Sequence, residues 1–314
     1  MVTIEVLQAR ARMLALVRGY FAERSVLEVE TPLLCSSTAM DPYLESFVVD
    51  TREGARYLQT SPEFPMKRLL AAGSGSIYQV CKSFRVDEVG ARHNPEFSML
   101  EWYRVGWSSD ELQKEVIALV QLVSGELDCD WAVHEPLTYA QLFESVVGLN
   151  PFEADPSDLA AVAKKHLGES LPELDRIGWL DLLMSQVVEP AMPEGLTMLI
   201  DFPAEQAALA KKVQNADGHW VAKRFELYVN GVELANGYQE LVDAKEQRSR
   251  FEEDNHQRRM MGLPELPIPE LLIEAMESGL PECAGVALGL DRLLMLALGK
   301  SSLEEVLPFT FPNA

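Results

Sequence analysis

Two arginines, several acids and an aromatic residue lie close together near the end of the first third of the chain. The segment reads FRVDEVGARHNPEFSMLE from Phe84 to Glu101. An arginine side chain binds a carboxylate or a phosphate through two parallel hydrogen bonds, and an aromatic ring can lie under a purine. We therefore expect this segment to bind ATP and a carboxylate together. The alternative is a plain hairpin whose charges form solvated surface salt bridges.

Two strands would position these side chains. Apolar and β-prone residues on each side predict antiparallel strands over residues 77–84 and 97–103, with Gly90 in the loop between them. Side chains alternate between the two faces of a strand, so Phe97 and Glu101 are expected on one face.

Hydrophobic spacing and capping signals place further elements along the chain. They predict helices over 5–23, 110–123 and 244–261, and a hairpin of 48–51 with 56–60 that turns at Glu53-Gly54. Residues 127–196 differ from the flanking segments. There Thr138 with Gln141 forms a capping box, and Asp155-Pro156 begins a second helix that ends at Gly168. A third helix runs over 174–189 and stops at Pro190. This part is expected to be a helical insertion, and strands follow at 225–229 and 232–240.

The segment from Phe84 to Glu101 resembles motif 2 of the class II aminoacyl-tRNA synthetases. Residues 18–34 resemble motif 1, a long helix that runs into a strand with Pro32 at the joint, and residues 285–298 resemble motif 3. Thr60 to Glu63, Met66 to Leu69 and Glu226 to Glu240 are similar to lysyl-tRNA synthetases in particular. The resemblance implies an α+β fold: one class II catalytic domain over residues 1–314, with a mostly antiparallel sheet flanked by helices and an insertion at about 127–196.

The resemblance also implies which residues bind ATP and metal. The ATP-binding residues would be Arg85, Val86, Asp87, Arg92, His93, Asn94, Phe97, Glu233, Leu234, Gly289 and Arg292. Arg85 and Arg292 would be catalytic: Arg85 would bridge the substrate carboxylate and the α-phosphate, while Arg292 and Phe97 would cover the two faces of adenine. Glu226 and Glu233 would hold Mg²⁺, which prefers carboxylate and phosphate oxygens. The alternative for these two acids is an ordinary strand face.

A second set of residues would bind an amino acid with two amines. The set comprises Ser61, Pro62, Glu63, Tyr103, Asn236, Glu240 and Ala287. By resemblance, Glu63 binds the backbone ammonium, and Tyr103 with Glu240 binds the distal ammonium of lysine. Lysyl-tRNA synthetases have Gly-x-Gly-x-Gly at motif 3, whereas this chain has alanine at 287. That alanine and the sequence ELANG at 233–237 resemble the family of elongation factor P (R)-β-lysine ligases.

Charge and composition exclude several classes of protein. The formal net charge of −22 is a poor match to RNA, so tRNA is an unlikely partner. We expect no membrane span, because no segment is long and apolar enough, and no signal peptide, because the N-terminus has no sustained apolar core. We also expect no anticodon-binding domain, because motif 1 begins near Arg18. The 4 cysteines have no zinc-like spacing and are expected to be reduced, non-ligating thiols.

These features favour a cytoplasmic homodimer that uses ATP and Mg²⁺ to activate (R)-β-lysine or lysine. The acyl group would then pass to a lysine side chain of elongation factor P. One alternative is a truncated lysyl-tRNA synthetase-like enzyme that acylates tRNA or another amine. The other is a non-catalytic regulatory paralogue, which the retained arginines and metal acids argue against.

Overall fold

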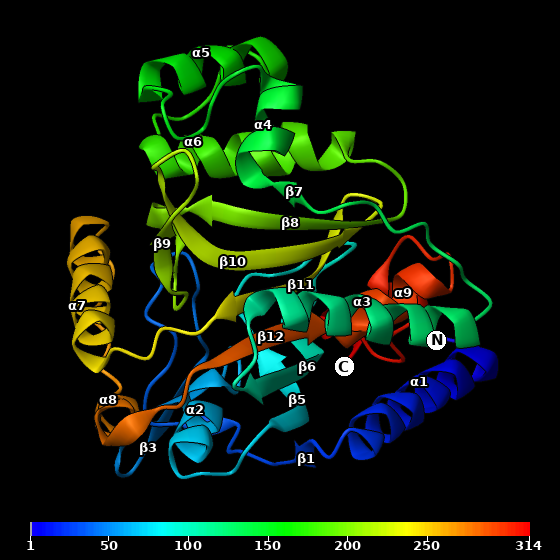
Figure 1. Cartoon of the computed structure of the whole chain (residues 1–314). Helices are drawn as coiled ribbons and strands as arrows, with labels where there is room; N and C mark the ends of the chain where they lie inside the picture. Colours follow the sequence, from blue (N-terminus) through cyan, green and yellow to red (C-terminus); the bar gives the residue numbers. More distant parts are fainter. Residues whose placement is uncertain (1) are drawn as a thin grey trace. The chain divides into compact units, whose positions relative to one another are not determined.

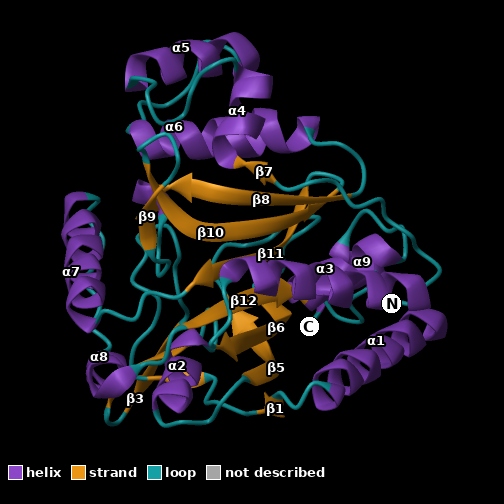
Figure 2. Ribbon diagram, viewed as in Figure 1, coloured by secondary structure: helices purple, strands orange, loops and turns teal. Residues whose placement is uncertain are grey.

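The computed structural model describes residues 2–314, and these form two compact units. The first unit holds the chain up to Asp130 together with Glu240–Ala314, and the second holds Trp131–Gln239 (Figure 1). Each unit combines helices with a mostly antiparallel sheet, as Figure 2 shows. The α+β fold class expected from the sequence is confirmed. Within residues 2–314, every helix is too short or too polar to cross a membrane.

The sheet of the first unit is built on the two strands predicted around the arginine-rich loop. Its strands, in spatial order, are β1 (Leu27–Glu28), β5 (Ile77–Phe84), β6 (Glu96–Val105) and β12 (Cys283–Gly289). Strand β1 runs parallel to β5, whereas the β5–β6 and β6–β12 pairs are antiparallel. The chain segments that resemble motifs 2 and 3 are therefore neighbouring strands.

Helices cover one face of this sheet. They are α1 (Ile4–Glu23), α3 (Ser109–Glu126) and α9 (Leu290–Ala297), which contact one another and strands β6 and β12 (Figure 1). Alternation along β6 points Trp102 and Arg104 to this face. Both side chains donate hydrogen bonds to the buried Glu115 of α3. Glu101 and Tyr103 consequently belong to the opposite face, which these three helices do not cover.

The remaining elements of the first unit form a small sheet and a helical group. The sheet has the order β2 (Leu34–Cys35), β4 (Gly54–Leu58) and β3 (Val48–Thr51). The helices are α2 (Glu63–Ala71), α7 (Ala244–Met260) and α8 (Glu270–Gly279), with α8 contacting both α2 and α7. Helix α2 begins directly after the predicted substrate residues Ser61 and Pro62.

In the second unit, helices pack on a group of strands. These strands, in spatial order, are β7 (Leu137–Thr138), β8 (Leu196–Pro203), β10 (Trp220–Val229) and β11 (Val232–Gln239). Strand β9 (Lys212–Gln214) pairs with β10. Helices α4 (Tyr139–Val147), α5 (Pro156–Leu167) and α6 (Arg176–Leu183) lie above β8 in Figure 1. Their apolar side chains, among them Phe143, Leu159 and Trp179, form one buried core with Leu199 and Phe202 of β8.

Helices α1 and α7 and strand β5 have nearly the expected limits, whereas other elements differ. Strand β4 begins at Gly54, which pairs with Thr51 instead of forming the turn, and β10 begins at Trp220 instead of residue 225. The prediction ended helix α3 at Ser124 and Gly125, but the helix continues through both residues as far as Glu126. The third helix of the insertion is shorter than expected. Its α-helical part ends at Leu183, and residues 184–191 continue as a π turn and a 3₁₀ turn that contains Pro190. The capping box at Thr138 is confirmed.

Candidate active site

Small and acidic residues share the face of the first sheet that is opposite α3. Tyr103 of β6 lies directly across from Gly285 of β12, and Glu101 lies across from Ala287 of β12 and Gln79 of β5. Residues directly opposite one another on paired strands point to the same face. The glycine and the alanine of motif 3 therefore lie beside two side chains that can bind an ammonium group.

A buried lysine lies between two of the predicted substrate acids. The Nζ atom of Lys67 is 2.6 Å from Oε1 of Glu63 and 2.6 Å from Oε2 of Glu240. The side chains of Lys67 and Glu240 are each only 1% exposed. Burial alone would lower the pKa of Lys67, but the two carboxylates raise it above its ordinary value. Lys67 is therefore a permanent cation in this cluster.

Glu101 is a third acid in the same place. Tyr103 donates its hydroxyl hydrogen to Oε1 of Glu101 at 2.7 Å, and Ser61 donates to Oε2 at 3.0 Å. Burial, together with the charges of Glu63 and Glu240, raises the pKa of Glu101 to about 8. Near neutral pH this carboxyl group is therefore protonated until a cation arrives to stabilise its charge.

Gly285 forms the floor of this pocket. A Cβ atom added there would collide with the ring of Tyr103 and with Oε1 of Glu240. Both neighbours are buried, so neither can turn away into solvent. Glu240 is also tied to β12, because its backbone N–H donates to the carbonyl of Cys283 at 3.0 Å. The absence of a side chain at position 285 is what lets the phenol and the carboxylate meet.

The predicted nucleotide residues begin at the end of β5. The backbone N–H of Arg85 donates to the carbonyl of Pro95 at 2.9 Å, which extends the pairing of the two strands. The guanidinium carbon of Arg85 is 5.1 Å from the centre of the Phe97 ring, and Nη1 is 3.4 Å from Oε1 of Glu88. Among the described residues, nothing accepts a hydrogen bond from the buried Nε of Arg85. This arginine keeps donor capacity for an anion.

Arg292 in the first turn of α9 contacts the loop of motif 2. Its Nε donates to the backbone carbonyl of Arg92 at 3.1 Å, and its Nη2 is 2.7 Å from Nε2 of His93. The preceding residue, Asp291, accepts the backbone N–H of Ser98 at 2.7 Å. These contacts bring Arg292 beside the strand that carries Phe97, as the resemblance implies.

Three other predicted ATP residues lie in or beside this loop. Asp87 is exposed and has a φ of +60°, and Val86 precedes it. Asn94 is buried and uses both ends of its amide within the chain: Nδ2 donates to the carbonyl of Glu96 at 2.6 Å, and Oδ1 accepts the N–H of Phe311 at 2.8 Å. Asn94 thus shapes the loop. Direct ATP binding by these three residues stays a prediction.

In the second unit, strands β10 and β11 carry the predicted metal-binding acids. Glu226 lies opposite Asn236 in the register of the two strands. An irregularity between Leu227 and Tyr228 shifts the register, so that Glu233 lies opposite Tyr228. This bulge adds Glu233 to the row that contains Glu226 and Asn236, which a regular alternation would not do. Leu234, predicted to contact ATP, is the buried residue that follows.

The electrostatics of this row suit a cation. Burial raises the pKa of Glu226, Arg224 lowers it, and the nearby charge of Glu233 raises it again. Arg224 pairs with Oε1 of Glu226, and the hydroxyl of Tyr228 donates to Oε2 at 2.5 Å. The buried Oδ1 of Asn236 has no hydrogen-bond partner within residues 2–314. Two carboxylates near an unused carbonyl oxygen fit Mg²⁺, which also takes phosphate and water oxygens. No cluster of three or more His, Cys, Asp or Glu side chains suited to a metal occurs in the described chain.

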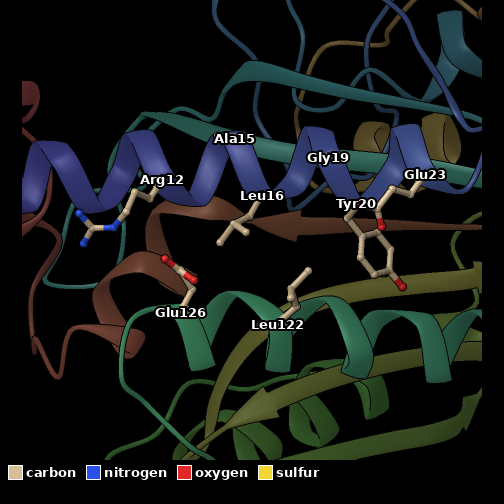
Figure 3. A pocket seen from close by; sticks show the side chains of 8 residues that line it. All are labelled: Arg12, Ala15, Leu16, Gly19, Tyr20, Glu23, Leu122 and Glu126. Carbon is tan, nitrogen blue, oxygen red and sulfur yellow. The ribbon is translucent and has the colours of Figure 1, made fainter.

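In the first unit, a groove lies between α1 and α3. Figure 3 shows Leu16 and Leu122 pointing toward one another across it, with Arg12 and Glu126 at one end and Tyr20 toward the other. Its volume is about 420 Å³. None of the predicted substrate residues line it, so it is separate from the candidate active site.

Comparison with known proteins places the chain in a family. The family model described as class II tRNA synthetases (D, K and N) matches residues 2–313. The chain belongs to this family. Class II synthetases are ATP-dependent ligases, and the protein is therefore an enzyme of this type.

Curated relatives within the class II synthetases have nearly the same length as this chain. A protein of Vibrio parahaemolyticus named elongation factor P--(R)-beta-lysine ligase is 49% identical over 322 residues, which cover 99% of this chain and 97% of the relative. A protein of Pasteurella multocida with the same name is 46% identical over 319 residues, with 99% and 97% covered. The resemblance inferred from the motifs is confirmed.

The site prediction did not name two charged residues of this cluster. Glu63, Tyr103 and Glu240 meet around Lys67 and Glu101, neither of which was assigned to the site. Glu101 could have been found, because it shares a strand face with Tyr103. Lys67 had only a weak signal, its position four residues after Glu63, which is also the spacing of an ordinary helical salt bridge.

Proposed function

We propose that this class II ligase activates (R)-β-lysine or lysine with ATP and transfers the acyl group to a lysine side chain of elongation factor P. The observation that carries the proposal is the cluster of Glu63 with the buried Glu101 and Glu240. Phe97, which contacts Arg85, lies on the same face of β6 as Glu101. A pocket with several acids binds a substrate with more than one amine. The names of the relatives supply the acceptor, elongation factor P.

Recognition of the amino acid rests on paired charges. A buried ammonium group needs a carboxylate, since either charge alone is costly away from water. Glu63 would bind the ammonium near the substrate carboxylate, and Glu240 with Tyr103 would bind the distal one. Ser61, Pro62 and Ala287 would line the space between, and Asn236 would donate to the substrate carboxylate. A substrate with one amine would leave a carboxylate unpaired, which disfavours it.

Activation joins two anions, so charge neutralisation is the main task of the protein. A carboxylate oxygen of the substrate attacks the α-phosphorus of ATP, the bond to the bridging oxygen breaks, and pyrophosphate leaves with that electron pair. Arg85 would hold the attacking carboxylate and the α-phosphate, and the charge on its guanidinium stabilises the crowded phosphorus centre. Phe97 and Arg292 would fix adenine between them, and Arg92 with His93 would contact the outer phosphates.

Mg²⁺ would be held by Glu226 and Glu233, and when bound it would neutralise phosphate charge. Arg224 and Tyr228 hold the carboxylate of Glu226 in one orientation. This orientation is a property of the chain, and it would be present before the ion binds.

Transfer uses the neutral ε-amine of a lysine on elongation factor P. The amine attacks the carbonyl carbon of the adenylate, the carbon–oxygen bond to AMP breaks, and AMP leaves with the electron pair. The new amide nitrogen then releases a proton to solvent. The net charge of −22 opposes RNA as the acceptor, because a phosphate backbone would be repelled. A protein acceptor avoids this repulsion.

We also propose that the enzyme is a cytoplasmic homodimer. The groove between α1 and α3 presents Leu16 and Leu122 with charged residues at its ends, and Leu27 and Leu34 of the first unit are exposed as well. Apolar surface of this kind fits a second copy of the chain. Sedimentation equilibrium would test this, since Leu122→Glu should shift the mass toward that of a monomer.

The decisive experiment is intact-mass analysis of elongation factor P after incubation with the enzyme, Mg²⁺-ATP and each lysine isomer. We expect a gain of one lysyl group, and a larger yield with (R)-β-lysine than with lysine. A parallel reaction contains tRNA in place of the factor. Acylated tRNA with unmodified elongation factor P would favour the truncated synthetase alternative. Absence of pyrophosphate exchange with every amino acid would favour the non-catalytic one.

A further inference from the structure

The pocket contains a cation that the proposed reaction does not use. Lys67 contacts Glu63, which is one turn earlier in α2, and Glu240, which is far away in the sequence. The contact with Glu63 alone would be an ordinary ion pair within helix α2. On a solvated surface such a pair stabilises a helix by about a few tenths of a kcal/mol. The second contact and the 1% exposure of Lys67 show that its ammonium group belongs to the pocket.

The contacts of Lys67 use one oxygen of each acid. Lys67 is bound by Oε1 of Glu63 and by Oε2 of Glu240. The other oxygen of Glu240, Oε1, faces the space above Gly285 next to the ring of Tyr103. Lys67 therefore fixes the rotation of Glu240 so that its second oxygen points to the place predicted for the distal ammonium.

Lys67 also sets the charge of the pocket. The titratable groups around it are Glu63, Glu101, Glu240, Tyr103 and the thiol of Cys283. Burial raises the pKa values of Tyr103 and Cys283, so both groups are neutral. When ionised, the three carboxylates exceed the single ammonium by two charges. That surplus equals the summed charge of the two ammonium groups of the substrate, whose carboxylate is assigned to Arg85.

We propose that Lys67 is a positioning residue that determines specificity for a diamine. Its ammonium group fixes the rotation of Glu63 and Glu240, so that each can bind one ammonium group of the substrate with its second oxygen. This inference rests on the proposed function for the identity of the substrate. Without Lys67, the buried Glu240 would lose the cation that lowers its pKa and would retain its proton near neutral pH.

The test uses lysine-dependent pyrophosphate exchange with Lys67→Met, and with Lys165→Met as the control. Lys165 is an exposed residue of α5. We expect Lys67→Met to raise the KM for lysine about 10- to 100-fold and to leave the KM for ATP within about 3-fold. The raised KM should fall as the pH increases from about 6.5 to about 8.5, because the acids of the variant ionise over that range. Lys165→Met should match the unmodified enzyme.

Two further measurements separate a role in the pocket from a role in folding. Ethylammonium should restore much of the exchange activity of Lys67→Ala, whereas ethanol should not. The double variant Lys67→Met with Glu101→Gln removes one cation and one acid, and should bind lysine more tightly than Lys67→Met alone. If Lys67→Met does not fold, the double variant is compared with Glu101→Gln by the same assay.

Several outcomes would overturn the inference. An unchanged KM for lysine in Lys67→Met, or an equal rise in the KM for lysine and for ATP, would do so. Failure of the single and the double variant to fold would assign Lys67 to stability alone. If the unmodified enzyme shows no exchange with lysine or (R)-β-lysine, the proposed function itself fails. If it is active and Lys67→Met is equally active, only the role of Lys67 is wrong.

Discussion

Substitution of Gly285 by alanine should damage the amino acid pocket selectively. The added methyl group would overlap the ring of Tyr103 and Oε1 of Glu240. Tyr103 is 2% exposed and Glu240 is 1% exposed, so both are held on all sides. Tyr103 is further fixed by its hydrogen bond to Glu101, and Glu240 by its ion pair with Lys67. One of these contacts must break for the methyl group to fit.

The size of the effect follows from which contact breaks. Overpacking a close-packed interior costs about 1–3 kcal/mol of stability. Loss of a charge-assisted hydrogen bond to the substrate costs about 1.5–3 kcal/mol of binding. We therefore expect the KM for lysine to rise about 10- to 100-fold in Gly285→Ala, while the KM for ATP changes little. Pyrophosphate exchange at varied lysine and fixed ATP measures this directly.

Gly125→Ala is a matched control on the other side of the sheet. Gly125 lies in α3 without a positive φ, and a Cβ atom added there would meet no atom of a neighbouring element within 4 Å. Alanine is favoured over glycine inside a helix by about 0.5–1 kcal/mol, so this variant should melt slightly higher and keep full activity. A Gly285→Ala enzyme with the KM for lysine of the unmodified enzyme would refute the assignment of the pocket.

Three further results are expected. Arg85→Ala should lower pyrophosphate exchange by about 100-fold or more at saturating substrates, because charge stabilisation at phosphorus is lost, whereas Glu240→Gln should mainly raise the KM for lysine. Burial raises the pKa of Glu101 from 4.5 to about 8, so near neutral pH the folded protein holds a proton that the unfolded chain releases. The protonated Glu101 therefore contributes to stability at low pH, and this contribution is lost as the pH rises toward about 8. The melting temperature of Glu101→Gln should therefore fall less between about pH 5 and about pH 8.5 than that of the unmodified enzyme. An equal fall in the two proteins would contradict the buried, protonated state. Arg10→Met leaves Asp291 without the partner at 2.7 Å, and urea unfolding should show a loss of about 3 kcal/mol.

Local patterns were sufficient for the elements that carry the site. The β5–β6 hairpin was predicted from β-prone residues around a glycine-bearing loop, and β5 begins and ends where expected. The same alternation placed Phe97 and Glu101 on one face. Such predictions succeed where propensity and tertiary pairing agree, as they do along these strands.

Features that depend on long-range contacts were harder to predict. The bulge between Leu227 and Tyr228 puts Glu233 opposite Tyr228, but regular alternation gives no sign of it. The position of Glu233 in the site came from resemblance alone. In the same way, α3 passes through Ser124-Gly125, a pair that usually ends a helix, because its apolar stripe through Val123 is buried in the first unit. Tertiary burial outweighed the local stop signal.

Lys67 illustrates why a pocket is more than its ligand residues. A sequence motif identifies acids that bind a substrate, but it does not reveal a cation, such as Lys67, that contacts those acids. Glu63 and Lys67 have the spacing of a surface pair, and only the return of the chain at Glu240 turns that pair into a buried triad. Since a buried acid without a cation takes up a proton, the strength of diamine binding depends on Lys67 as much as on the carboxylates.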